Sequence, residues 1–426
     1  MRFDEALARL DARQPEHMPG PSLTRIRAVA DLLDHPERTY PTIHVTGTNG
    51  KTTAARATAA LACAHDLTTG LFTSPHLLSV TERLDVCGES IAPETFAEEW
   101  EHLEPILHLV DGAGDGEVTY FEAVTALAYL WFADKPVALA VFEVGMGGSW
   151  DATNLIAGEV AIVTPIGMDH VAELGPTLAD IAGEKAGVLK ADGVGVIRRQ
   201  DDVAAEVLRR RADEVGAELR WEGVDWEVEE RLLAVGGQSF RLRGSSATYE
   251  DLFLPLHGEY AVANAAAGVV ALEALTGRAL EEDTVREGLA GVGVPGRLEA
   301  VGHEPLILLD GAHNPAGAEA LAAALRASFR WQRLLLVLAI SANKDAAGIL
   351  AALEPLADAV FLARNESVRS ADPEDLRAAA RPEAAVFGSV AEAIGAARAD
   401  AGPADVIVVT GSLFTVADAK RALAGR

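Results

Sequence analysis

The sequence of 426 residues contains few cysteines, few aromatic residues and few basic side chains for its length. Its two cysteines, Cys63 and Cys87, are too few for a disulfide framework, and we expect Cys63 to be a small core residue. Lysine and arginine total 36 against 64 acidic residues, so the net charge is −28. This excess of negative charge argues against nucleic acid or an anionic membrane surface as a partner.

The sequence also lacks a long apolar run. No uninterrupted stretch approaches the roughly 18 apolar residues of a membrane-spanning helix, and residues 1–5 carry acids where a signal peptide would be apolar. We therefore expect a reducing, cytoplasmic compartment. Glycine is abundant at 39 residues, alanine is heavily used, and aromatic residues make up only 5%. This composition is typical of α/β proteins in which small residues pack helices onto sheets.

Residues 42–53 have the pattern of a phosphate-binding loop between a strand and a helix. The β-branched residues 42–46 predict a buried strand, and the Ala-rich segment after Lys51 predicts a helix. Gly47 and Gly50 allow a tight loop between them, whose backbone N–H groups can approach phosphate oxygens at a helix N-terminus. A Gly-rich turn that binds no nucleotide is the alternative.

The side chains of this loop fit the nucleotide interpretation. Lys51 would reach the terminal phosphates, and the hydroxyl of Thr52 would bind Mg²⁺. Val45 stands where the general phosphate-loop pattern has its first glycine, so the loop is the shorter Gly47-x-x-Gly50-Lys51-Thr52. The loop predicts a bound nucleotide, but by itself it does not indicate the use of that nucleotide.

Predicted strands and helices alternate after this loop. The strands cover residues 69–73, 137–142, 160–164 and 193–197, and the helices cover residues 94–110, 120–132 and 177–189. This alternation predicts a parallel, doubly wound sheet. Ligands bind outside the carboxyl edge of such sheets, so we expect the phosphate loop, Ser74, Glu143 and His170 to lie along one edge.

The length predicts roughly two or three domains. We expect a phosphate-loop NTPase-like ATPase domain over residues 1–293, with a small antiparallel insertion at about residues 201–256. A Gly- and Pro-rich stretch predicts a linker at residues 294–297. Strand–helix alternation then restarts, which predicts a smaller Rossmann-like α/β domain over residues 298–426.

Five polar residues outside the loop are candidates for chemistry, and each has a structural alternative. Glu143 follows a buried strand and could share Mg²⁺ with phosphates, or it could cap a turn. His170 is either a metal ligand or a packed or surface histidine, and Lys185 is either a functional amine or a stem that reaches solvent. Asp310 suits a ribose hydroxyl or an Asx turn, and Arg297 suits phosphates or solvent.

Taken together, the motifs resemble the folylpolyglutamate synthase family of the Mur ligase superfamily, whose members are often also dihydrofolate synthases. The resemblance covers nearly the whole chain, and the motifs that carry it are Gly47-Thr48-Asn49-Gly50-Lys51, Thr73-Ser74-Pro75-His76-Leu77, Glu143-Val144-Gly145-Met146-Gly147-Gly148, Asp151-Ala152-Thr153-Asn154, Gly167-Met168-Asp169-His170, Glu184-Lys185-Ala186-Gly187, Pro295-Gly296-Arg297-Leu298-Glu299, Asp310-Gly311-Ala312-His313-Asn314-Pro315 and Gly411-Ser412-Leu413-Phe414.

The resemblance implies an ATP-dependent ligase. In this family ATP phosphorylates a substrate carboxylate, and the amino group of L-glutamate attacks the acyl phosphate to give an amide, ADP and phosphate. The acceptor would be a folate such as tetrahydrofolate, and also dihydropteroate. We expect small-molecule substrates, no nucleic acid, no membrane and a monomer.

The resemblance also implies roles for individual residues, with ATP and the pterin bound by the N-terminal domain and glutamate ligation assigned to the C-terminal domain. The catalytic residues would be Lys51, Lys185 and His313. The nucleotide would be bound by Thr48, Asn49, Gly50, Lys51, Thr52, Thr53, Asn264, Arg297 and Asp310. Two Mg²⁺ ions would be bound by Thr52, Ser74, Glu143, His170 and a carbamylated Lys185. The other substrates would be bound by Ser22, Thr24, Arg25, Arg83, Tyr120, Phe121, Trp150, Asp151 and Ser412.

Three positions depart from the family pattern. Thr52-Thr53 replaces the usual Gly-Ser, Val294 stands where tryptophan is common, and Asn343 replaces an aspartate. Two other functions remain as alternatives. One is a Mur-type ligase that acts on a peptidoglycan precursor, and the other is a phosphate-loop ATPase that uses hydrolysis to switch conformation.

Overall fold

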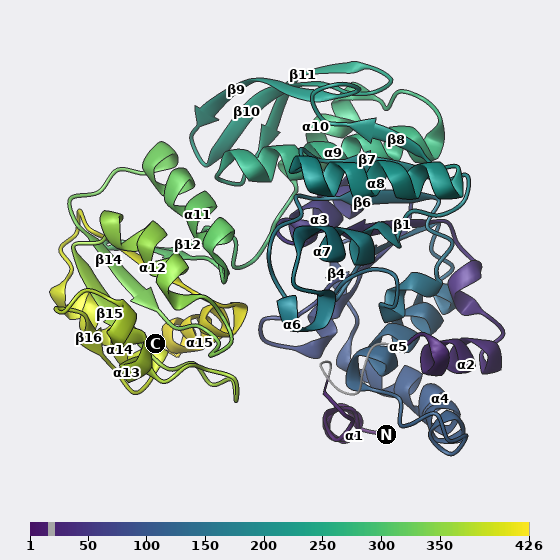
Figure 1. Cartoon of the computed structure of the whole chain (residues 1–426), viewed down its shortest axis with the longest axis horizontal. Helices are drawn as coiled ribbons and strands as arrows, with labels where there is room; N and C mark the ends of the chain where they lie inside the picture. The colour runs from purple at the N-terminus through teal and green to yellow at the C-terminus, as the bar shows by residue number, and fades with distance from the viewer. Residues whose placement is uncertain (16–21, 426) are drawn as a thin grey trace. The chain divides into compact units, whose positions relative to one another are not determined.

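The computed structural model describes residues 1–15 and 22–425, which form two compact units (Figure 1). The first unit consists of Met1–Ala234, Gln238–Pro255 and Ala263–Val292. The second consists mainly of the chain from Gly293 onward, together with Val235–Gly237 and Leu256–Val262. The first unit contains an eight-stranded and a three-stranded sheet, and the second contains a six-stranded sheet.

The first unit is built on an eight-stranded sheet with the order β4-β3-β2-β5-β1-β6-β7-β8. The strands are β1 (Thr42–Thr46), β2 (Thr69–Phe72), β3 (Leu84–Val86), β4 (Glu89–Ser90), β5 (Leu139–Glu143), β6 (Val160–Val163), β7 (Val194–Ile197) and β8 (Glu218–Trp221). The strands from β2 to β8 in this order pair in parallel, and the short β3 and β4 add antiparallel pairs at one edge. The predicted fold class is confirmed.

The three central strands of this sheet, β1, β5 and β6, are buried on both faces. All residues of β1, β5 and β6 are buried, as expected for apolar runs in a parallel sheet covered by helices. Val45 of β1 lies opposite Glu143 of β5, and Thr46 lies opposite Val163 of β6. This register brings the carboxyl ends of three strands to one place on the sheet edge.

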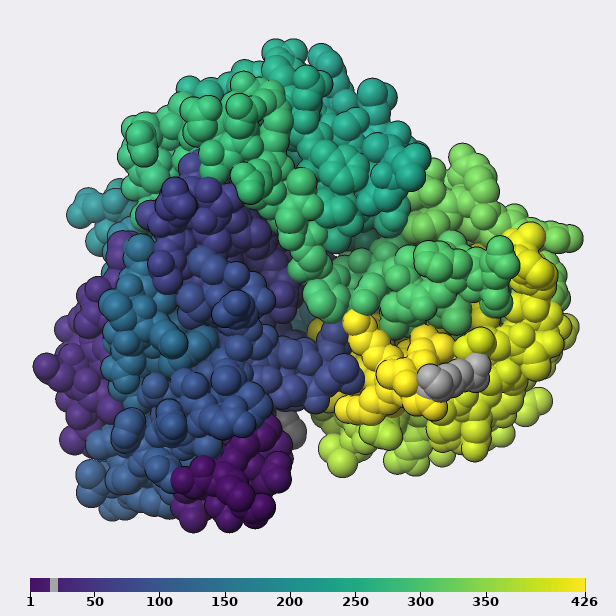
Figure 2. All heavy atoms as spheres, turned by 180° about the vertical axis from the view of Figure 1, so that it is seen from behind, coloured from purple at the N-terminus to yellow at the C-terminus, as the bar shows by residue number. Residues whose placement is uncertain are grey.

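Helices cover both faces of this sheet. They are α1 (Phe3–Asp11), α2 (Thr24–Leu32), α3 (Lys51–Ala64), α4 (Pro93–Asp111), α5 (Tyr120–Asp134), α6 (Val171–Leu174), α7 (Leu178–Ala186), α8 (Asp202–Val215), α9 (Glu259–Thr276) and α10 (Glu282–Ala290). Helices α4 and α5 pack around Phe72 and Phe142, while α7 and α8 pack around Ala161 and Val163. Helix α3 contacts β1, β2 and β5 and is covered by α10, and Figure 2 shows the green α10 segment against dark blue α3.

The antiparallel part of the first unit is smaller than the predicted span of residues 201–256. It is a three-stranded sheet of β9 (Glu227–Ala234), β10 (Gly237–Arg243) and β11 (Thr248–Leu254). Residues 202–215 form α8, and β8 extends the main sheet in parallel with β7. Only one face of α8 packs on the core, and the rest of its sequence is charged. The few apolar residues of that face are therefore easy to miss in the sequence.

One buried carboxylate attaches the small sheet to α9. Glu273 is fully buried and accepts hydrogen bonds from the backbone N–H groups of Ser245 (2.8 Å), Ser246 (3.1 Å) and Ala247 (3.2 Å), and from the hydroxyl of Tyr249 (2.8 Å). These four hydrogen bonds offset the free-energy cost of burying the carboxylate. Glu273 therefore fixes α9, which carries a candidate site residue near its other end.

The expectation for the cysteines was wrong. Cys63 is not a core residue but is half-buried, and it forms a disulfide with the exposed Cys87, with a Cα–Cα distance of 5.6 Å. Sequence spacing gave no signal for this pair, because the contact arises where the end of α3 meets the turn between β3 and β4. The disulfide removes the support that unpaired cysteines gave to a reducing compartment.

The second unit is a smaller doubly wound domain whose sheet has the order β12-β13-β17-β14-β15-β16. The strands are β12 (Glu299–His303), β13 (Leu306–Leu309), β14 (Leu334–Leu338), β15 (Ala359–Leu362), β16 (Ala385–Val386) and β17 (Val406–Thr410), and the helices are α11 (Pro315–Ser328), α12 (Ala346–Leu353), α13 (Pro373–Ala379), α14 (Val390–Asp400) and α15 (Leu413–Ala424). All pairs are parallel except that of β12 with β13. Among the described helices of the chain, none is both long and apolar enough to cross a membrane.

Candidate active site

The phosphate loop has a backbone that only glycine allows. Gly47 has φ +138°, and a Cβ there would lie 1.9 Å from Oγ1 of Thr164. Gly50 has φ +92° and is the N-cap of α3, and a Cβ there would lie 2.1 Å from Nδ2 of Asn264. The loop backbone thus leads into the start of a 14-residue helix, where backbone N–H groups can bind an anion.

Hydrogen bonds to backbone groups of the loop and of the segment after β6 fix the side chains of Lys51 and Thr48. Nζ of Lys51 donates to the carbonyls of Gly47 (3.2 Å) and Thr48 (3.3 Å). The hydroxyl of Thr48 bonds to both backbone groups of Gly167 at 3.0 Å, which ties the loop to the segment after β6. Thr53 is only 3% exposed, so Thr52 is the better placed of the two threonine hydroxyls.

Glu143, Thr52 and Ser74 meet at the sheet edge, as the sequence predicted. Oγ1 of Thr52 donates to Oε1 of Glu143 at 2.8 Å, and the backbone N–H of Ser74 lies 3.4 Å from Oε2 of the same carboxylate. Glu143 is 1% exposed. One buried carboxylate beside a hydroxyl and a phosphate loop is a donor set that fits Mg²⁺, which uses few protein oxygens together with phosphates and water.

The second predicted metal position is less enclosed. The side chain of His170 is 41% exposed, and its Nε2 lies 4.0 Å from Oδ2 of Asp169. Its backbone is left-handed, with φ +51°. Within the described ranges, no group of three or more His, Cys, Asp or Glu side chains is arranged to hold a metal ion. A metal at His170 would therefore need ligands from the substrate or from a modified lysine.

Lys185 is buried against the phosphate loop. It is 4% exposed, and its Nζ donates to the carbonyl of Gly47 at 2.8 Å. Burial lowers the pKa of Lys185 to about 7, and the positive charge of Lys51 acts in the same direction. The alternative of a stem that reaches solvent is therefore wrong, and burial favours the neutral form of the amine.

A glycine turn after β5 fixes the position of Lys185. A Cβ on Gly148 would lie 2.6 Å from the carbonyl oxygen of Glu184, so the turn packs directly on α7. Ser149 donates to the same carbonyl through its backbone N–H (2.9 Å) and its hydroxyl (3.0 Å). Glu143 ends β5 and Lys185 lies in α7, so the contact between the turn after β5 and α7 fixes the two side chains relative to each other.

Three of the predicted substrate residues lie near the loop after β2 and the turn after β5. The guanidinium of Arg83 lies over the ring of Tyr120 at 5.3 Å, and its Nε donates to Nδ1 of His76 at 3.0 Å. The ring of Phe121 packs on Gly145, where a Cβ would come within 2.6 Å. Arg83 is 3% exposed, so these groups form a packed cluster, and aromatic rings beside a guanidinium suit a flat, partly anionic substrate.

The remaining predicted substrate residues of this unit are engaged in structural bonds. Ser22 and Thr24 bond to each other at 2.9 Å, and Arg25 forms a buried double ion pair with Glu122, with both N···O distances at 3.0 Å. Trp150 packs beside Gly147 and the cluster on α7. Their role in substrate binding stays a prediction.

Asp151 belongs to a buried hydrogen-bond chain. It accepts from the backbone N–H of Met146 at 2.9 Å and from the hydroxyl of Thr153 at 2.5 Å. The same hydroxyl lies 2.8 Å from Nε2 of His44, and burial lowers the pKa of His44 to about 3. His44 is therefore neutral, and the chain holds the glycine turn against β1.

In the second unit, Asp310 and Arg297 are the residues predicted to bind the nucleotide, and Asp310 fixes the backbone around both. Its two oxygens accept from the backbone N–H groups of Leu298 and Ala312, each at 2.8 Å. Burial raises the pKa of Asp310, and the charge of Arg297 opposes this shift. A Cβ on Gly311 would lie 2.2 Å from Nη1 of Arg297, so the guanidinium lies over this turn.

His313 and Ser412 follow neighbouring parallel strands of the same unit. Nδ1 of His313 lies 3.0 Å from the carbonyl of Gly311, so Nδ1 carries the proton in the neutral ring. Ser412 is the N-cap of α15, and its hydroxyl accepts from the backbone N–H of Phe414 at 3.2 Å. Both residues lie at the carboxyl edge of the sheet, where ligands bind in this class of fold.

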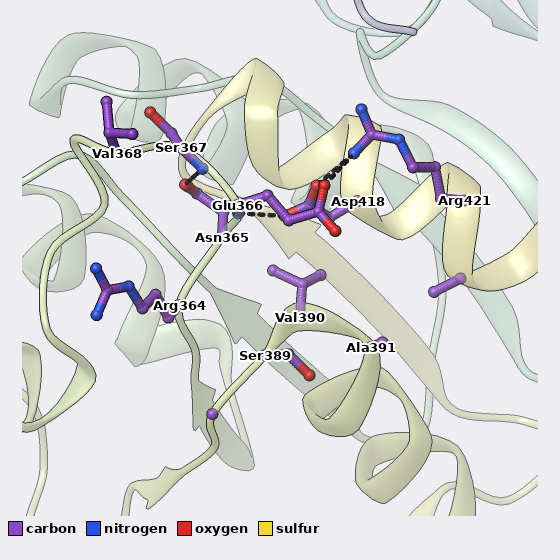
Figure 3. Close-up of a pocket in the computed structure, with 12 residues that line it drawn as sticks. Arg364, Asn365, Glu366, Ser367, Val368, Ser389, Val390, Ala391, Asp418 and Arg421 are labelled. Atoms are coloured by element: carbon purple, nitrogen blue, oxygen red, sulfur yellow. Dashed lines mark hydrogen bonds and ion pairs between the residues drawn. The ribbon is translucent and has the colours of Figure 1, made fainter.

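A cavity of about 610 Å³ lies at the carboxyl ends of β15 and β16 (Figure 3). Arg421 on its rim pairs with Glu366 at 2.9 Å and with Asp418 at 2.8 Å. Its charged groups thus largely compensate one another, and it contains none of the predicted site residues. We assign no substrate to it.

Sequence reasoning missed Arg198 and Glu222. Arg198 follows β7 and is 6% exposed, and its Nε donates to Glu222 at 2.8 Å. Its Nη1 donates to Oδ1 of Asn264. The available signal was an arginine directly after a predicted strand, at the same edge as the other site residues.

Comparisons with known proteins match both units of the chain. The models of the Mur ligase middle domain and of the Mur ligase glutamate ligase domain match residues 45–272 and 296–413, respectively. Dihydrofolate synthase/folylpolyglutamate synthase of Mycobacterium tuberculosis is 45% identical over 388 residues, which cover 87% of this chain and 80% of that protein.

Two solved structures are similar over the whole chain. Mycobacterium tuberculosis folylpolyglutamate synthase complexed with ADP has a TM-score of 0.94 and 42% identity, covering 100% of this chain and 98% of that one. Escherichia coli FolC in complex with DHPP and ADP has a TM-score of 0.89 and 31% identity, with the same coverage. The chain therefore belongs to the folylpolyglutamate synthase/dihydrofolate synthase family of the Mur ligase superfamily.

Proposed function

We propose that this protein is an ATP-dependent ligase that adds L-glutamate to a folate and also to dihydropteroate. Family membership supports the reaction class. The observation in the structure that carries the proposal is the buried Lys185 beside the phosphate loop and Glu143, since a nucleotide switch has no need of a buried lysine there. The substrates are small molecules, and a monomer in the cytoplasm, where ATP and L-glutamate are plentiful, is part of the same proposal.

The first half of the reaction makes an acyl phosphate. A carboxylate oxygen of the acceptor attacks the γ-phosphorus of ATP, and the bond to ADP breaks. The loop backbone and Lys51 hold the phosphates and offset the charge that develops on the transferred group. Glu143, Thr52 and Ser74 would hold Mg²⁺, which supplies further positive charge at the phosphates when it is bound.

Lys185 is proposed to bear a carbamate. Its neutral amine attacks CO₂, a C–N bond forms, and the product loses one proton to give a carbamate anion. A pKa of about 7 favours this step, because only the neutral amine is nucleophilic. The carbamate would replace a buried amine by an anionic oxygen ligand, and with His170 it would hold a second Mg²⁺.

The second half of the reaction forms the amide. The neutral amino group of L-glutamate attacks the acyl carbon, and the tetrahedral intermediate expels phosphate. His313 is the proposed acceptor of the amine proton, because its Nδ1 bonds to a carbonyl and Nε2 is then the basic nitrogen. Arg297 and Asp310 are proposed to contact ATP, Ser412 to contact glutamate, and Arg83, Tyr120 and Phe121 to contact the pterin substrate.

The acceptor assay separates the alternatives. ADP release is measured with L-glutamate and, in turn, tetrahydrofolate, dihydropteroate and a uridine-linked peptidoglycan precursor. We expect release with both pterin acceptors and none with the uridine-linked precursor. Release only with that precursor would indicate a peptidoglycan ligase, and release that is indifferent to every acceptor would indicate an ATPase.

A further inference from the structure

We propose that Arg198, held by Glu222, is a positioning residue that fixes the orientation of the Asn264 amide over the phosphate loop. The inference rests on the proposed binding of ATP at this loop. The four elements involved are β7, the end of β8, α9 and the start of α3, and the residues that make the contacts, Asn264 of α9 included, belong to the first unit.

The position of Arg198 is fixed at both its backbone and its side chain. Its backbone N–H continues the sheet by donating to the carbonyl of Val163 at 3.0 Å. Its Nε donates to Oε2 of Glu222 at 2.8 Å, and the same oxygen accepts from the backbone N–H of Arg199 at 2.7 Å. The side chains of Arg198 and Glu222 are 7% and 8% exposed, so the pair is screened little by solvent.

The guanidinium determines which way the Asn264 amide points. A guanidinium has only donors, so the atom of Asn264 that bonds to Nη1 of Arg198 must be the carbonyl oxygen Oδ1. The NH₂ group therefore points to the other side. There Gly50 approaches so closely that a Cβ would lie 2.1 Å from Nδ2 of Asn264.

This orientation matters because the nucleotide is negatively charged. With Oδ1 held by Arg198, the amide presents N–H donors to the phosphate loop. Without Arg198 the amide can rotate, and its carbonyl oxygen can face the phosphates, which repel it. A bonded amide also loses less conformational freedom when ATP binds. Arg198 thus acts on ATP through Asn264 and Gly50 and does not itself need to contact the nucleotide.

The test measures ADP affinity by calorimetry and, separately, the KM values for ATP, folate and L-glutamate. We expect Arg198→Met to raise the Kd for ADP and the KM for ATP about tenfold, because a tenfold change corresponds to the loss of one charge-assisted hydrogen bond. We expect kcat to change less than about threefold, and Arg198→Lys to restore part of the affinity. Arg13→Met is the matched control, since the side chain of Arg13 is 10% exposed and pairs with Asp111 at 3.4 Å in the same unit, outside this chain of contacts.

A double-mutant cycle decides whether Arg198 acts through Asn264. We expect Asn264→Ala to weaken ADP binding, and Arg198→Met to add less than about twofold in that background. Additive effects, or normal ADP affinity in folded Arg198→Met, would overturn the proposal. If Arg198→Met does not fold, the paired variant Arg198→Leu/Glu222→Leu removes both buried charges and takes its place in the cycle.

These outcomes are distinct from failure of the proposed function. Calorimetry with ADP needs no ligase chemistry, so it tests Arg198 even if no acceptor supports turnover. If Asn264→Ala leaves ADP affinity unchanged, the nucleotide role of Asn264 is wrong and the proposal for Arg198 falls with it.

Discussion

Lys185 combines burial, a neighbouring cation and a hydrogen bond to the phosphate loop. Its Nζ lies 2.8 Å from the carbonyl of Gly47, and the pKa of the amine is lowered to about 7. Lys190 offers a comparison, because its pKa is lowered to about 8 and its Nζ bonds to the carbonyl of Asn154 at 3.1 Å. Of these two lysines, only Lys185 forms its hydrogen bond with the phosphate loop.

We expect Lys185→Ala to abolish ligation and to leave ADP affinity within about threefold of the wild type, because the carbamate is needed for chemistry rather than for nucleotide binding. Lys190→Ala is the control and should retain ligation. In ¹³C NMR with labelled bicarbonate, the wild type should show a carbamate signal that rises as the pH passes about 7, where Lys185 loses its proton. Full activity of Lys185→Ala would remove Lys185 from the site.

Arg25 was predicted to bind substrate, and the structure pairs it with Glu122 inside the protein. The two side chains are 7% and 6% exposed. We expect Arg25→Met to lower the free energy of unfolding by about 3–5 kcal/mol, because Glu122 would be left buried without its partner.

Urea denaturation measures this change, with the exposed Arg27→Met in the same helix as a control expected to stay within about 0.5 kcal/mol of the wild type. A role in substrate binding alone would raise the KM for folate and leave the unfolding free energy unchanged. That result would contradict the structural role of Arg25.

At the scale of elements, the phosphate loop depends on two glycines with positive φ. We expect Gly47→Ala to lower ADP affinity and stability together, because its Cβ would lie 1.9 Å from Oγ1 of Thr164 and 2.8 Å from the carbonyl oxygen of that residue. Gly183→Ala is the control, since no heavy atom lies within 4 Å of a Cβ at that position in α7. It should be neutral or stabilising by up to about 1 kcal/mol. Unchanged ADP binding in Gly47→Ala would contradict the described loop.

The order of strands and helices was largely predictable, because buried parallel strands have apolar sequences and each is followed by a polar loop. That Thr52, Ser74 and Glu143 lie along one edge of the sheet was predictable for the same reason, and their meeting at one metal site was implied by the family resemblance. The helix α8 was missed because its buried stripe is narrow and its sequence is mostly charged. The pairing of Arg198 with Glu222 and Asn264 was missed because it joins residues from three separate segments, and no local pattern reports such a contact.

At the scale of the whole molecule, a net charge of −28 implies self-repulsion in the folded state. We expect the melting temperature to rise between low salt and about 0.5 M KCl, because the Debye length falls from about 30 Å at 0.01 M to below 10 Å. Each kcal/mol of screened repulsion should raise the Tm of this 426-residue chain by about 1 °C, since the entropy of unfolding grows with chain length. Calorimetry in matched buffers measures this, and a Tm that falls with salt would show that attractive surface pairs dominate instead.

The central claim is that ATP is used to join glutamate to a pterin acceptor. The most direct measurement is mass spectrometry of the acceptor after incubation with ATP, Mg²⁺ and L-glutamate, with ADP quantified in the same sample. The proposed function predicts an acceptor that is heavier by one glutamyl residue for each ADP formed, and no ADP above background when L-glutamate or the acceptor is omitted. ADP formation with no change in acceptor mass would contradict it.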